Sequence, residues 1–137
     1  MSGLDIDKAL PPYARTLAIR SAGLEDGVPV LSMPFQDSVI GRPGFLHGGA
    51  ISGLLEIASI AALRSALADE DRDVRIKPIN VTVDFMRGGS DHDTFAVGRI
   101  TRLGRTLANV EAVAWQTDRS RLIASAQMHY LLRDPAP

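Results

Sequence analysis

Hydrophobic positions along the chain form one long continuous stretch and several alternating ones. From Gly48 to Leu67 nearly every residue is apolar or small, and only Glu56 and Arg64 carry charge. This pattern predicts a central helix, because a helix that is apolar all round needs cover on every side. Glu56 would then be a buried carboxylate, which is costly unless the protein uses it.

Alternation of apolar and polar residues with a period of two predicts strands before and after this helix. The clearest run is residues 79–86, where Ile79, Val81 and Val83 alternate with polar neighbours. The other predicted strands are residues 13–24, 28–35, 94–103, 106–116 and 121–132. The four strands after the helix have short links, including a tight hairpin at Leu103-Gly104-Arg105, and predict an antiparallel meander.

The remaining segments complete a single domain over residues 1–137. Residues 2–10 predict a short acidic helix within an N-terminal segment of about residues 1–12, and residues 133–137 form a tail. The chain is therefore expected to be α+β, with a curved antiparallel sheet of five to six strands wrapped around one long helix. The last strands carry apolar residues on both faces, so self-association is expected.

The composition bears on which partners the protein binds and where in the cell it is found. The formal net charge of -1 gives no reason to expect a nucleic-acid partner. The absence of cysteine excludes disulfides and thiolate chemistry and agrees with a cytoplasmic location. Glu56 near the centre of the apolar stretch would cost about 2.5–3.5 kcal/mol in a bilayer, so no membrane span is expected.

One motif carries a resemblance that covers the chain from Tyr13 to Leu132. Leu46-His47-Gly48-Gly49 is followed by a carboxylate, Glu56, nine residues after the histidine. With this spacing the chain resembles the hotdog-fold thioesterases of the PaaI type, which are small acyl-CoA hydrolases. Residues 81–87 and the basic hairpin at residues 102–105 are also similar to that family. The resemblance implies a hotdog fold, an acyl-CoA substrate, no cofactor, and homodimers that pair into tetramers.

The resemblance also assigns roles to individual residues. Gly48 matches the position whose backbone N–H polarises the thioester carbonyl, and Glu56 matches the catalytic carboxylate. The family usually carries Asn or Gln six residues before the histidine, where this chain has Gly41. Gln36, Asp37 or a water would have to replace that amide. The Ser or Thr of some members, four residues after the carboxylate, is Ile60 here, with Ser59 beside it.

Physical chemistry, apart from the resemblance, also indicates the start of the helix and Glu56 as the candidate site. The start of a helix presents free N–H groups and positive dipole to a ligand, and Gly48 and Gly49 leave that approach open. Glu56 is suited to attack a carbonyl or to act as general base on water, and the sequence leaves both routes open. Gly48 and Glu56 lie about 12 Å apart along one helix, so one substrate reaches both only if a second chain supplies Glu56. A homodimer with shared active sites follows.

Plainer readings remain open beside these roles. His47 can serve only to hold the loop, the glycines only to allow close packing, and Glu56 only to pair with an arginine. Arg87, Arg102 and Arg105 are candidates for binding the phosphates of coenzyme A, and equally for solvated strand ends. His92 and His129 lack ligand spacing, so no metal is expected.

Two functions are therefore carried forward. The first is hydrolysis of an acyl- or aryl-CoA thioester to free acid and CoA. The second is a non-catalytic hotdog module that binds acyl-CoA or another apolar ligand. A cystatin-like scaffold fits less well, because its helix usually precedes all the strands.

Overall fold

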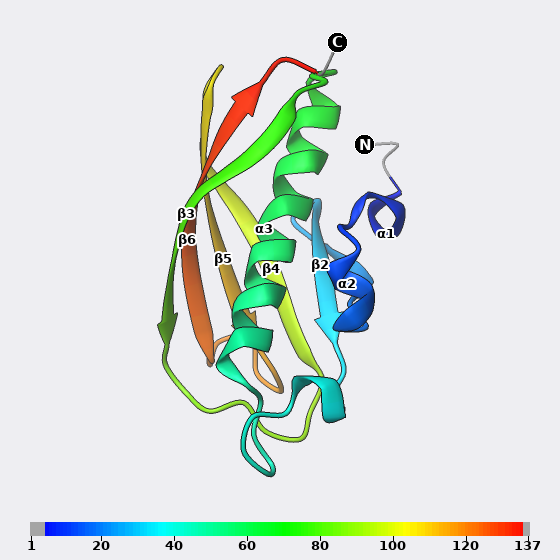
Figure 1. Cartoon of the computed structure of the whole chain (residues 1–137), viewed down its shortest axis with the longest axis vertical. Coiled ribbons are helices and arrows are strands. Elements are labelled where there is room, and N and C mark those ends of the chain that lie inside the picture. The colour runs from blue at the N-terminus through cyan, green and yellow to red at the C-terminus, as the bar shows by residue number, and fades with distance from the viewer. Residues whose placement is uncertain (1–4, 136–137) are drawn as a thin grey trace.

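A computed structural model describes residues 5–135 as one curved sheet folded around a long helix (Figure 1). The helix is α3, Gly48–Asp69, two residues longer than expected at its end. The six strands are β1 (Arg20–Glu25), β2 (Val28–Met33), β3 (Arg75–Phe85), β4 (Thr94–Leu103), β5 (Leu107–Trp115) and β6 (Ala124–Arg133). Short helical pieces are α1 (Ile6–Ala9), α2 (Tyr13–Thr16) and η1 (Asp37–Val39). The predicted α+β hotdog arrangement is confirmed.

The strand order corrects the predicted meander. The sheet runs β1-β2-β4-β5-β6-β3, so β3 pairs with β6 at the far edge rather than with β4. Residues 86–93 are the reason: they form a long irregular link that crosses the end of the molecule instead of a tight turn (Figure 1). The hairpin between β4 and β5 is confirmed, with the Gly104 N–H donating to the Leu107 carbonyl at 2.8 Å.

The first half of the strand predicted over residues 13–24 is wrong. Pro11 and Pro12 start a helical turn, in which the Ala14 N–H donates to the Pro11 carbonyl at 2.9 Å. Proline suits the first turn of a helix, because it has no N–H to satisfy there. Ala18 then takes a positive φ of 54° and turns the chain into β1. The acidic helix expected over residues 2–10 is confirmed over Ile6–Ala9, and residues 1–4 lie outside the described part.

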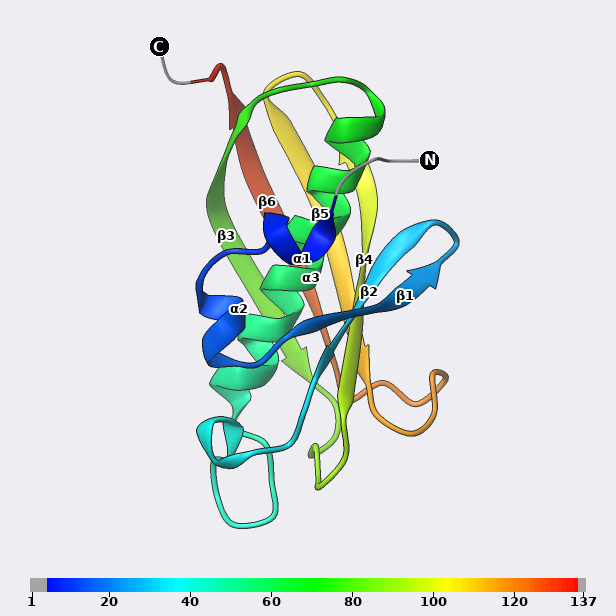
Figure 2. The same ribbon diagram turned by 90° about the vertical axis from the view of Figure 1, so that its right-hand side faces the viewer.

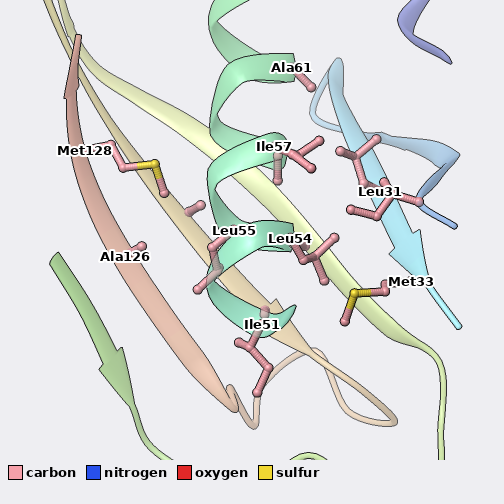
Figure 3. Close-up of a cluster of buried hydrophobic side chains, with 14 of the residues drawn as sticks. Leu31, Met33, Ile51, Leu54, Leu55, Ile57, Ala61, Ala126 and Met128 are labelled. Atoms are coloured by element: carbon pink, nitrogen blue, oxygen red, sulfur yellow. The ribbon is translucent and has the colours of Figure 1, made fainter. Parts of the chain in front are cut away.

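The core lies between α3 and the concave face of the sheet (Figure 3). Leu54 and Leu55 of α3 are fully buried against Leu31 and Met33 of β2 and the strands beyond. A Cβ at Gly98 of β4 would stand 2.8 Å from the Ala62 Cβ, so glycine there lets helix and sheet approach. By length and composition α3 is apolar enough to cross a membrane, but 61% of its 18-residue apolar window is buried inside the protein, as expected of a core helix.

One stripe of α3 is left uncovered by the sheet. Gly49, Gly53, Glu56 and Ile60 lie within about 60° of one another around the helix axis, and none is fully buried. The complete burial expected for Glu56 is therefore wrong for the single chain, where it is half-buried. Figures 1 and 2 show α1 and α2 against one side of α3 and β3 on the other.

Strand β3 is also exposed at its outer edge. Ile79, Val81 and Phe85 keep 53%, 48% and 56% of their surface exposed, although they lie on an apolar strand. The half-buried strand predicted over residues 79–86 is thus open to solvent along most of its length in the single chain. Where this edge meets α3, Glu56 and residues 78–81 line one side of an open apolar pocket, while Gly53 on the same stripe packs against Tyr13 and Leu17 of the α2 region.

Candidate active site

The N-terminus of α3 leaves one backbone donor without a partner. His47 is the N-cap, and its Nδ1 accepts the N–H of Gly49 at 2.8 Å. The His47 carbonyl accepts the N–H groups of Ala50 and Ile51 at 3.0 and 3.2 Å. Of the four N–H groups that open the helix, Gly48 alone has no acceptor among residues 5–135. The positive end of the helix dipole adds to the pull of this N–H on a developing negative charge.

Steric contacts explain separately why glycine occupies position 48 and position 49 of the motif. A Cβ at Gly49 would stand 2.9 Å from the His47 Nδ1, so glycine there makes room for the capping ring. A Cβ at Gly48 would stand 3.4 Å from Cζ of Phe85, whose ring lies beside the helix start. His47 therefore acts on the backbone, as its plainer reading predicted. Phe85 joins the site through a contact that the sequence alone did not indicate.

The loop before the helix explains the missing amide at Gly41. The His47 N–H donates to the Val39 carbonyl at 2.8 Å, and the Gly41 N–H donates to the Phe45 carbonyl at 3.0 Å. This tight loop brings Gly41 against His47, where a Cβ on residue 41 would stand 3.1 Å from the His47 Cα. An Asn or Gln at this position does not fit without moving the loop.

Glu56 lies two turns into the helix, at the edge of a pocket of about 210 Å³. The pocket lies between α3, residues 78–81 of β3, and Met128 and Tyr130 of β6. Among residues 5–135 no lysine, arginine or histidine forms an ion pair with Glu56, so the structural pairing with an arginine is not found. A half-buried carboxylate beside an apolar pocket is available to react with what the pocket holds.

The two residues predicted beside Glu56 point in different directions. Ile60 lies on the uncovered stripe and is half-buried. Ser59 is fully buried, and its hydroxyl lies 2.9 Å from the hydroxyl of Tyr130, so it does not face solvent. Burial raises the pKa of Tyr130 to about 12, and the nearby charge of Glu56 adds to the rise against the lowering by Ser59. Its hydroxyl therefore stays protonated at neutral pH.

The three predicted phosphate-binding arginines do not lie together. Arg87 lies just after β3, whereas Arg102 and Arg105 belong to the hairpin between β4 and β5. Figure 1 shows the end of β3 near the start of α3 and this hairpin at the opposite end of the sheet. There Arg105 lines a groove of about 700 Å³ with three arginines that sequence reasoning missed, Arg72, Arg75 and Arg133. Arginine outnumbers lysine 13 to 2 in the sequence, but no spacing indicates that these four converge.

The geometry limits what one chain can do alone. Gly48 and Glu56 are separated by about 12 Å along α3, so they do not contact the same reacting carbonyl. Within residues 5–135, no cluster of three His, Asp or Glu side chains that could hold a metal ion is found. The site thus offers one oxyanion donor and one carboxylate, with an apolar pocket beside the carboxylate.

Comparisons with known proteins place this geometry in a family. The family model of the thioesterase superfamily matches residues 43–123, more than half of the chain. A solved structure from Chromobacterium violaceum is 30% identical, with a TM-score of 0.71, covering 91% of this chain and 85% of its own. A thioesterase variant from Pseudomonas aeruginosa is 25% identical, with a TM-score of 0.75 and coverages of 88% and 85%.

A third similar structure concerns the fold alone. A thioesterase from Haemophilus influenzae has a TM-score of 0.78 at 17% identity, covering 89% of this chain and 82% of its own. No curated protein matches the chain. The matched segment contains the His-Gly-Gly motif, Glu56 and β3 to β5. This chain belongs to the thioesterase superfamily and has its hotdog fold.

Proposed function

We propose that the protein hydrolyses acyl- or aryl-CoA thioesters to the free acid and CoA. The observation that carries the proposal is the unpaired Gly48 N–H at the start of a helix whose uncovered face also bears Glu56. The N–H would stabilise the oxyanion that forms on the thioester carbonyl. Membership of the thioesterase superfamily supports thioester hydrolysis in general.

Two routes remain for Glu56. In the first, its carboxylate attacks the carbonyl carbon, the C–S bond breaks with release of the CoA thiolate, and water hydrolyses the acyl-carboxylate anhydride. In the second, Glu56 takes a proton from water, the hydroxide adds to the carbonyl, and the tetrahedral intermediate expels the thiolate. Both routes end with a carboxylic acid and CoA, and both use the Gly48 N–H in the same way.

The active form is a homodimer in which each site combines Gly48 of one chain with Glu56 of the other. Two α3 helices running antiparallel bring these residues together, because the 12 Å offset in one chain is cancelled by the reversed partner. The incompletely buried Gly49 and Ile60 of α3 and the exposed edge of β3 support such an interface. Pairing of two dimers into a tetramer and a cytoplasmic location stay predictions.

The basic groove suits the phosphates of coenzyme A. Arg72 donates to the carbonyls of Gly104 and Arg105 at 3.1 Å each, which fixes it beside the hairpin. Arg75, Arg105 and Arg133 supply further guanidinium groups, which bind phosphate through charge-assisted hydrogen bonds. Glu56 and the end of α3 at Asp69 are roughly 20 Å apart along the helix. The extended pantetheine arm of CoA is of comparable length.

Release of free thiol from a panel of acyl-CoAs tests the reaction. Wild-type protein is expected to turn over at least one member, and Glu56→Gln to lose nearly all of that rate while keeping its fold. Asp26→Asn, which changes an exposed carboxylate in the turn between β1 and β2, is the matched control. Equal background rates for wild type and Glu56→Gln would refute the proposal.

A mixed dimer tests the shared site. Glu56→Gln chains and Gly48→Pro chains are each expected to be inactive alone. In a 1:1 mixture about half of the dimers combine the two chains and each carries one intact site, so roughly a quarter of the wild-type rate should return. Absence of any recovery after subunit exchange, with exchange verified by mass spectrometry, would exclude sharing.

The second candidate function is binding without turnover. The absence of the family's amide at Gly41, where a Cβ would crowd the His47 Cα at 3.1 Å, favours it. Calorimetric binding of an acyl-CoA that is never hydrolysed would support this alternative against the first.

A further inference from the structure

The inner wall of the pocket beside Glu56 is fixed by a buried chain of hydrogen bonds. The Tyr130 hydroxyl donates to the Met128 Sδ at 3.2 Å. With its proton used in this way, the same oxygen accepts the hydroxyl proton of Ser59 at 2.9 Å. All three side chains are at least 98% buried, so water does not compete for these bonds.

This chain restrains a side chain that is usually adaptable. Methionine has three rotatable bonds and commonly fills irregular gaps by changing rotamer. Met128 points from β6 toward α3 (Figure 3), and its thioether is held from behind by Tyr130. Ser59 lies one turn beyond Glu56 on α3, so the same helix supplies the carboxylate and the end of the chain. Helix α3 thus connects Glu56 to the hydrogen bonds that hold Met128 in the pocket wall.

The opposite wall is shaped by an irregularity in β3. The pairing of β3 with β6 shifts register between Pro78 and Asn80, which leaves Ile79 as an extra residue. Such bulges bend a strand and often lie beside active sites. The pocket lies at this bulge, with Pro78 and Val81 on its β3 side.

The size of the pocket sets a limit on what it can hold. An engineered apolar cavity of about 150 Å³ holds benzene, which corresponds to about 25 Å³ per carbon. At that ratio the pocket of about 210 Å³ takes about eight carbons. A single aromatic ring with a short linker or a medium-length alkyl chain fills this volume, and Met128 and Tyr130 line its β6 side.

We propose that Met128, positioned by Tyr130 and Ser59, closes the inner end of the acyl site and restricts the substrate to acyl groups of up to about eight carbons. The inference rests on the proposed thioesterase function and names the substrate class of that site. Met128 is the specificity-determining residue, because it contacts the end of the acyl group. Tyr130 and Ser59 are positioning residues that act through it.

The test compares kcat/KM across straight-chain acyl-CoAs from acetyl to palmitoyl. Wild type is expected to fall sharply beyond about eight carbons. Met128→Ala removes three heavy atoms, which extends the cutoff by about three carbons on the same scale. Because one methylene in an apolar pocket changes discrimination by roughly 10- to 200-fold, the decanoyl to hexanoyl ratio should rise at least about tenfold. Tyr130→Phe should make the fall of kcat/KM with chain length less steep, because the Met128 thioether loses its hydrogen bond.

Met33→Ala is the matched control, because Met33 is a fully buried methionine on β2 away from this pocket. It should lower stability without changing the decanoyl to hexanoyl ratio. A general packing role for Met128 would lower all rates together, whereas the ratio moves only if Met128 limits chain length. An unchanged ratio in folded Met128→Ala would overturn the proposal.

Binding of non-hydrolysable acyl-CoA thioethers of the same lengths separates this inference from the proposed reaction. A cutoff in affinity that moves in Met128→Ala, without thioester turnover in wild type, would refute the reaction and keep the pocket assignment. Turnover in wild type with no movement of the cutoff in either rate or affinity would refute the pocket assignment alone.

Discussion

Replacing Gly48 with proline removes the proposed oxyanion donor while leaving the helix start in place. Gly48 is the first residue of α3, where proline is well tolerated because its missing N–H has no helical partner. His47 already has φ −71° and ψ 135°, the extended conformation that a residue before proline prefers. A Cβ at residue 48 would contact Phe85 Cζ at 3.4 Å, an ordinary packing distance.

The substitution is expected to lower the rate strongly and to raise the stability slightly. Loss of one oxyanion donor lowers kcat by about 100- to 1,000-fold, or roughly 2.7–4 kcal/mol. Proline at a compatible position stabilises by about 0.4–1 kcal/mol, because the unfolded chain loses freedom. Gly48→Pro should therefore be folded at least as stably as wild type and nearly inactive. Gly48→Ala adds the Cβ but keeps the N–H, so it is the matched control.

Thiol release at saturating acyl-CoA and urea unfolding measure the two effects on the same preparations. The reasoning requires a large fall in kcat for Gly48→Pro and a small one for Gly48→Ala. Wild-type kcat in a folded Gly48→Pro protein would refute the role of the N–H. Equal losses in both variants would instead assign the effect to crowding against Phe85.

Three further predictions concern the loop and the buried polar chain. His47→Ala removes the N-cap acceptor and should lower the free energy of unfolding by about 1 kcal/mol, while His47→Asn should recover most of it, measured with urea. Gly41→Asn restores the family amide, but its Cβ would stand 3.1 Å from the His47 Cα. The variant should therefore have a lower urea midpoint and no higher kcat than wild type. A higher kcat would contradict this. The pKa of Tyr130 is raised from 10.0 to about 12 in the folded protein. The protonated hydroxyl therefore contributes fully to the free energy of unfolding below pH 10. This contribution is lost as the pH rises toward 12, because the unfolded chain ionises first. The loss approaches about 3 kcal/mol, read as the difference in urea stability between wild type and Tyr130→Phe across that range; parallel curves would contradict it.

Hydrophobic periodicity predicted the elements well where packing and local preference agree. The continuous apolar run located α3, and alternation located β4, β5 and β6 within a few residues. It did not predict the partner of β3, because alternation reports which face is buried and not which strand lies alongside. It also mistook residues 13–16 for a strand, where the two prolines and the positive φ of Ala18 decide the local conformation.

The candidate site was predictable only where its residues are close in sequence. His47, Gly48 and Glu56 occur in one segment, so their spacing indicated both the donor and the need for a second chain. Phe85 reaches Gly48 from β3, and Tyr130 reaches Ser59 from β6, and such contacts across the sheet leave no local pattern. The groove of four arginines likewise draws on three separate parts of the chain.

The loop from Val39 to His47 links the departure at Gly41 to the route of the reaction. Its backbone bonds hold His47 in place to cap α3, and in the same tight loop a Cβ on residue 41 would crowd the His47 Cα at 3.1 Å. An amide that places the water or the thioester is then missing from the position where the family carries it. General-base catalysis needs such a placed water in its first step, whereas direct attack by Glu56 does not. Because that amide can place either the water or the thioester, its absence leaves both routes for Glu56 open, and another group has to position the missing partner in either route.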